Sequence, residues 1–140
     1  MKIYFIVVFT LISYVAFSCS CIVPDEFDEN QYNSYDLILK GKIINITKNK
    51  QGTFLTIKVD KYYKGDLQKN IVKVNTPSTE GLCGLYVNVG ETWLIFAYNF
   101  KSLFKSDQCT RSKRLSNKPL PSQSQLIKAD LEFLERKQKL

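Results

Sequence analysis

The stretch TFLTIKVDKYY (Thr53–Tyr63) alternates apolar and polar residues with a period of two. The apolar side chains fall on one face and the polar ones on the other: Leu55, Ile57 and Val59 against Thr56, Lys58 and Asp60. Such alternation is typical of a β-strand that buries one of its faces. We therefore predict a half-buried strand here.

Four further segments have the composition of strands. They are LILKGKIINI (37–46), IVKVNT (71–76), TWLIFAY (92–98) and SLFKSDQC, which we expect to close a last strand at Cys109. Turns are predicted at TKNKQG (47–52) and at Gly65. TWLIFAY is the most apolar of the five, which predicts a central strand covered on both sides. Five short strands at this spacing favour a small barrel or sandwich.

The C-terminal stretch PSQSQLIKADLEFLERKQKL (121–140) has the period of a helix. Ser122 and Gln125 form a capping-box pattern, which predicts that the helix begins after Pro121. The residues at helical spacing are Leu126, Ile127, Asp130, Leu131 and Leu134. We expect Ile127, Leu131 and Leu134 to lie against the strands, with Lys128, Glu132 and Arg136 in water. A membrane-surface helix is disfavoured, because acidic residues interrupt the polar face.

Residues 1–18 have the pattern of a secretory signal peptide. A basic start at Lys2 precedes an uncharged apolar run, which ends in the small-x-small cleavage signal Ala16-Phe17-Ser18. The run is shorter than the ~20 residues of a spanning helix, so a membrane anchor is disfavoured. Cleavage after Ser18 leaves one small domain that begins at Cys19 and is secreted or periplasmic. Lipoprotein processing at Cys19 is disfavoured, because no large aliphatic residue stands three positions before that cysteine.

The chain has four cysteines, and two of them flank a single residue at the mature N-terminus. In an oxidising compartment four cysteines favour two disulfides over a metal site. Cys19 and Cys21 are too close to bridge each other comfortably, so each is expected to reach Cys83 or Cys109. A four-thiolate zinc site is the competing interpretation, and it prefers a Cys-x-x-Cys spacing that is missing here.

The composition excludes several kinds of catalysis. The chain has no histidine, which removes Ser-His-Asp and Cys-His mechanisms and imidazole metal ligands. No phosphate-binding glycine loop or dinucleotide fingerprint is present. We therefore expect no enzymatic activity, no cofactor and no metal of the protein's own.

The net charge of +7 is concentrated toward the C-terminus. A basic cluster comprises Arg111, Lys113, Arg114 and Lys118. It suggests binding to a sulfated glycan or another polyanion. Nucleic acid is not expected, because the cluster lacks interleaved aromatic residues for base stacking and export disfavours such a partner.

Several segments together resemble one known family. They are CSC (19–21), LILKGKI (37–43), VDKYYKG (59–65), TPSTEGLCGLYVNVGETWLIFA (76–97) and DQC (107–109). These are similar to the inhibitory domain of the tissue inhibitors of metalloproteinases, which are netrin-like modules, in a short single-domain form similar to bacterial members. The resemblance implies a five-stranded Greek-key barrel of the oligonucleotide/oligosaccharide-binding (OB) type over residues 19–114, followed by a basic linker and helix over 115–140. It also implies the disulfides Cys19–Cys83 and Cys21–Cys109.

The resemblance further implies a function. The free α-amine and carbonyl of Cys19 would chelate the catalytic zinc of a metalloendopeptidase, and Ser20 would point to its specificity pocket. The residues expected on this contact ridge are Cys19, Ser20, Cys21, Ile22, Val23, Pro24, Ser78, Thr79 and Leu82. The alternative is a monomeric extracellular interaction module, with or without polyanion binding, because a fold does not fix a function.

Overall fold

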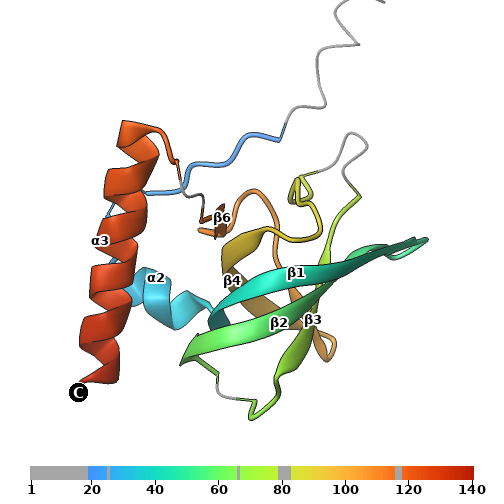
Figure 1. The fold of residues 1–140 in the computed structure, drawn as a ribbon, viewed down its shortest axis with the longest axis horizontal. Helices are drawn as coiled ribbons and strands as arrows, with labels where there is room; N and C mark the ends of the chain where they lie inside the picture. Colours follow the sequence, from blue (N-terminus) through green and yellow to red (C-terminus); the bar gives the residue numbers. More distant parts are fainter. Residues whose placement is uncertain (1–18, 25, 66, 79–82, 116–117) are drawn as a thin grey trace, which may run out of the picture.

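The computed structural model describes residues 19–24, 26–65, 67–78, 83–115 and 118–140 (Figure 1). The predicted signal peptide, residues 1–18, lies outside the described residues. The described part is mainly β, with a long helix at the C-terminus. This agrees with the fold class expected from the strand patterns.

Five strands close into a ring, and a sixth short strand adds to its edge. The strands are β1 (Leu37–Asn49), β2 (Gly52–Lys64), β3 (Ile71–Thr76), β4 (Thr92–Phe100), β5 (Leu103–Lys105) and β6 (Lys113–Arg114); the helices are α2 (Glu29–Ser34) and α3 (Pro121–Gln138). The order is β1-β2-β3-β5-β4, and β4 pairs back onto β1. The β3–β5 pairing is parallel, and the other pairings are antiparallel.

Strand β2 shows the alternation that its sequence predicts. Leu55 and Ile57 are fully buried inside the ring, whereas Lys58 and Asp60 are exposed. Their neighbours on β1 and β3 continue the same apolar layer, since Ile43 and Val72 both pair with Ile57. The ring interior is thus one of two apolar clusters in the described chain.

Strand β4 lies between the two clusters. Ile95 and Ala97 face the ring interior, while Leu94 and Phe96 face the second cluster, which lies outside the ring. The rings of Phe27 and Tyr35 cover Phe96, with ring centroids 5.3 and 5.1 Å away. The prediction of a central strand covered on both sides is confirmed, and it explains why this segment is apolar at consecutive positions.

Helix α3 completes the second cluster, standing beside the ring with α2 next to it (Figure 1). Leu134 is fully buried and Leu131 is half-buried, whereas the predicted water-facing residues, Lys128, Glu132 and Arg136, are exposed. Ile127 is only half-buried. No helix in the described ranges is long and apolar enough to span a membrane.

The predicted capping box at Ser122 is wrong. The helix begins at Pro121, so Ser122 already lies in its first turn, and the cap residue Leu120 makes no side-chain hydrogen bond. Proline is well suited to the first helical position, because its fixed φ fits the helix and its missing N–H has no partner there in any case. Proline therefore marks the beginning of this helix, and the Ser/Gln pattern does not.

The predicted last strand is also too long. Strand β5 ends at Lys105, and Cys109 lies in a turn organised by Asp107. The Asp107 carboxylate accepts hydrogen bonds from the backbone N–H groups of Cys109 (2.9 Å) and Thr110 (3.1 Å). Such side-chain to backbone bonds compete with strand pairing. The chain then returns to pair with β4 through β6, which the sequence does not indicate.

Glu91 joins this edge of the ring to the preceding turn. Its carboxylate accepts hydrogen bonds from the Trp93 indole (2.9 Å), from the backbone and side chain of Asn88 (3.0 and 3.1 Å) and from Arg114 of β6 (3.0 Å). Burial disfavours the charged form, but these hydrogen bonds outweigh it and lower the pKa of Glu91 from 4.5 to about 2. The fold therefore stabilises the ionised carboxylate.

This pKa predicts an acid-sensitive contribution to stability. A group whose pKa is lower in the folded than in the unfolded state stabilises the protein at pH values above its unfolded-state pKa. That contribution disappears as the pH falls toward its folded-state pKa. The unfolding free energy of the unmodified protein should fall between about pH 6 and pH 2.5, as Glu91 becomes protonated. In Glu91→Gln we expect this fall to be smaller by up to about 3 kcal/mol. Urea unfolding at both pH values measures the difference.

Glu29→Gln is the matched control for that measurement. Its carboxylate pairs with Lys137 but is 56% exposed, so this variant should keep the pH dependence of the unmodified protein. An equal pH dependence for Glu91→Gln and the unmodified protein would contradict the role assigned to Glu91.

Candidate functional site

The candidate site is the N-terminal segment, residues 19–24, which two disulfides fasten to the ring. Cys19 bonds to Cys83 and Cys21 bonds to Cys109, with Cα separations of 5.5 and 5.0 Å. These are the partners that the resemblance implies, and both separations lie in the usual range for disulfides. Two disulfides are typical of proteins in oxidising compartments.

Side chains along the segment alternate between the ring and solvent. Cys21 and Val23 are half-buried, whereas Ser20 is exposed and Ile22 is 94% exposed. An extended segment places residues two apart on the same side, so anchoring through Cys19 and Cys21 turns Ser20 and Ile22 outward. The segment thus presents backbone atoms and two outward side chains.

The loop around Cys83 lies close against the end of β3. A Cβ added to Gly84 would lie 2.1 Å from the carbonyl oxygen of Pro77, so only glycine fits beside Cys83. The same added atom would lie 3.2 Å from the backbone of Ser78, which places this predicted ridge residue near the disulfide. Thr79 and Leu82, also predicted for the ridge, lie outside the described residues.

Gln108 holds the two disulfide-bearing loops together. Its backbone N–H donates to the carbonyl of Cys83 (2.9 Å), and its side-chain amide donates to the carbonyl of Gly84 (3.0 Å). Cys83 and Cys109 are therefore neighbours through hydrogen bonds that do not depend on either disulfide.

Arg111 provides a third anchor, at the far end of the segment. Its guanidinium donates to the carbonyl of Pro24, to the side chain of Gln31 (3.1 Å) and to both carboxylate oxygens of Asp130 on α3 (2.8–3.0 Å). Arg111 is 3% exposed and Asp130 is fully buried, and the guanidinium lies 5.2 Å from the centre of the Phe27 ring. The N-terminal segment is thus connected to the C-terminal helix through one buried ion pair.

Tyr35 supports the backbone of Arg111. Its hydroxyl accepts a hydrogen bond from the Arg111 backbone N–H at 3.1 Å. Burial raises the pKa of Tyr35 above its usual value of 10.0, so the phenol is neutral at physiological pH. This support for Arg111 consequently does not titrate near neutrality.

The prediction that Arg111 belongs to a polyanion-binding cluster is wrong. The structure places this residue in the interior, because a buried aspartate needs a cation beside it. Lys113 also pairs with Asp130 (2.7 Å), and Arg114 pairs with Glu91 (3.0 Å). Lys118 is exposed. Three of the four cations are therefore engaged by carboxylates of the protein itself.

Asp130 is the important residue that the sequence interpretation did not use. It lies three residues after Ile127 and four before Leu134, on the apolar face of the helix. An acidic residue on the apolar face of a helix indicates a buried cation partner, because an unpaired buried charge is very costly. That signal was present, but it does not identify which cation is the partner.

No family model matches the chain. No curated protein matches it either.

Replacing Asp130 should destabilise the protein strongly. Asp130→Asn removes the carboxylate that pairs with the buried Arg111, and breaking a buried pair in this way costs about 3–5 kcal/mol. Urea unfolding should show this loss. Glu132→Gln on the exposed face of α3 is the matched control and should change stability by less than about 0.5 kcal/mol. Similar unfolding midpoints for the two variants would show that the pair does not hold α3 in place.

Proposed function

We propose that the mature protein, beginning at Cys19, inhibits a zinc metalloendopeptidase by binding its catalytic metal. The observation that carries the proposal is the exposed Cys19, fixed by its own disulfide and by the one two residues later. Cleavage after Ser18 would give Cys19 a free α-amine next to its carbonyl group. These two atoms form a chelating pair.

The chemistry requires an open zinc position and a neutral amine. A catalytic zinc keeps one coordination position for water or substrate, which a chelating ligand can occupy. An α-amine has a pKa of about 7.7–8.0, so its neutral form is accessible near neutral pH, and metal binding promotes loss of the proton. The amine and carbonyl would displace the water that attacks the substrate.

Rigidity supports the proposal. Ordering a flexible terminus during binding reduces affinity, whereas a terminus that is already fixed avoids this cost. Here the segment is fixed at Cys19, at Cys21 and, through Arg111, at Pro24. The exposed Ser20 and Ile22 would then enter the substrate cleft on either side of Cys21.

A ring of five strands supports an OB-type barrel as the scaffold. The ring has the order β1-β2-β3-β5-β4 and closes between β1 and β4, and an OB-type fold is a five-stranded Greek-key barrel. The disulfide partners support the netrin-like assignment, since they are those implied by the resemblance to the metalloproteinase inhibitors.

The proposal predicts that inhibition depends on the N-terminal amine. We expect protein beginning at Cys19 to inhibit one or more metzincin catalytic domains in a fluorogenic peptide assay. A form that retains Ser18 should lose at least about 100-fold in potency, because its amide nitrogen cannot bind the metal. The protease with Co²⁺ in place of zinc should change its visible spectrum with the first form and not with the second.

Matched controls separate the mechanism from misfolding and from other functions. Both forms must have the same disulfides and circular dichroism spectrum. Equal potency of the two forms would contradict chelation, and no inhibition by either across the panel would favour a plain interaction module. Salt-sensitive retention on heparin that is the same for both forms would favour polyanion binding instead.

A further inference from the structure

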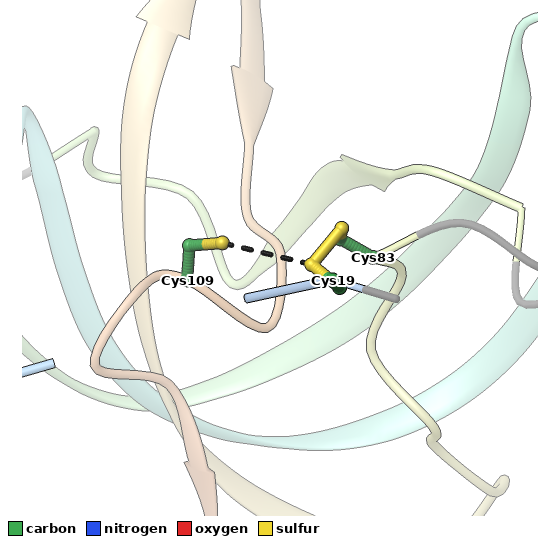
Figure 2. Close-up of side chains that lie close together, drawn as sticks. All are labelled: Cys19, Cys83 and Cys109. Atoms are coloured by element: carbon green, nitrogen blue, oxygen red, sulfur yellow. Dashed lines mark hydrogen bonds between the residues drawn. A yellow bond between two sulfur atoms is a disulfide. The ribbon is translucent and has the colours of Figure 1, made fainter. Parts of the chain in front are cut away.

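The sulfur atoms of the two disulfides lie in contact with one another. Across the two bridges, the Cys19 sulfur lies 3.5 Å from that of Cys21 and 3.8 Å from that of Cys109. Figure 2 shows the Cys19–Cys83 bridge with its Cys19 sulfur turned toward Cys109. The sulfur atoms of Cys19, Cys83 and Cys109 all lie within 4.8 Å of one another.

These distances match those of a metal bound by four thiolates. Zinc–sulfur bonds of about 2.3 Å at tetrahedral angles separate the sulfur atoms by about 3.8 Å. Two of the four sulfur–sulfur distances between the bridges, Cys19 to Cys21 and Cys19 to Cys109, already have nearly this length. The two bonded pairs would have to separate, from about 2.0 Å to about 3.8 Å, and the sulfur atom of Cys21, which is not in the group of three within 4.8 Å, would have to approach that of Cys83.

The scaffold allows that adjustment without rebuilding the ring. Cys83 and Cys109 are held by the hydrogen bonds of Gln108 and Asp107, which involve no sulfur atom of either disulfide. Cys19 and Cys21 lie on a segment that takes part in none of the strand pairings of the described chain. That segment can therefore move outward by the small distance required while Pro24 stays bound to Arg111.

We propose that the four cysteines, once reduced, form a tetrathiolate site for one zinc ion. A dithiol supplies the electrons: two dithiols reduce the two disulfides, leaving four protein thiols and two cyclic disulfides. Zinc then displaces four thiol protons and gives a site with a net charge of −2. Soft thiolates select zinc over calcium or magnesium, which prefer oxygen ligands. This site would belong to the reduced protein, and it does not rest on the proposed inhibition of a protease.

Cobalt(II) titration tests this site directly. The full mature chain is reduced with a dithiol under anaerobic conditions, freed of the dithiol and titrated with Co²⁺ alone. We expect the intense visible absorption of tetrahedral cobalt thiolate, saturating at one metal per chain and bleached by one equivalent of Zn²⁺. The oxidised protein should give no such absorption, and reduced Cys83→Ser should bind at least about 10-fold more weakly.

A titration in denaturing urea distinguishes a site that the folded protein preorganises from four reactive thiols on an unfolded chain. We expect binding there to be at least about 100-fold weaker, because the folded loops hold Cys83 and Cys109 together before the metal arrives. Absence of the tetrahedral spectrum, a different stoichiometry, or equal affinity in urea would each overturn the proposal. If reduction alone unfolds the chain, recovery of its circular dichroism on adding Zn²⁺ supports the site, and failure to recover contradicts it.

Discussion

Two disulfides set the position of the whole N-terminal segment. Residues 19–24 belong to no strand pairing, so the segment gains its fixed position from covalent bonds and from the contact at Pro24. The bridges span 64 and 88 residues. By restricting the unfolded chain, bridges that close loops of this length each stabilise the folded protein by roughly 4 kcal/mol. The same bonds that stabilise the small ring therefore also hold Cys19 rigid and exposed, which is the property that the proposed inhibition needs.

The ion pair between Arg111 and Asp130 extends this constraint to the C-terminus. Helix α3 buries Leu134 against the outside of the ring, and its Asp130 orients the guanidinium that binds Pro24. Helix α3 thus takes part in positioning residues 19–24, which lie far from it in the sequence. The buried pair is expensive to desolvate, and we assign it a role in fixing one arrangement of residues 19–24 and helix α3.

Local patterns predicted most of the fold, and long-range contacts account for what they missed. Alternation at Leu55 and Ile57 identified a strand because burial on one face leaves a period of two in the sequence. The turn at Asp107 shortened a predicted strand through side-chain hydrogen bonds that composition does not reveal. The partners Arg111 and Asp130 are 19 residues apart, and nothing local distinguishes that arginine from its basic neighbours. The disulfide pairing came from family resemblance, since the residues alone left both pairings open.

The most direct test is to determine the disulfide pattern and the N-terminal residue of the protein isolated after expression of the full sequence. Non-reducing digestion followed by electron-transfer mass spectrometry would identify which cysteine of the Cys-Ser-Cys sequence carries each partner peptide. We predict an unblocked terminal Cys19 joined to Cys83, with Cys21 joined to Cys109. A lipid or an extra residue on Cys19, or a bond from Cys19 to Cys109, would contradict it.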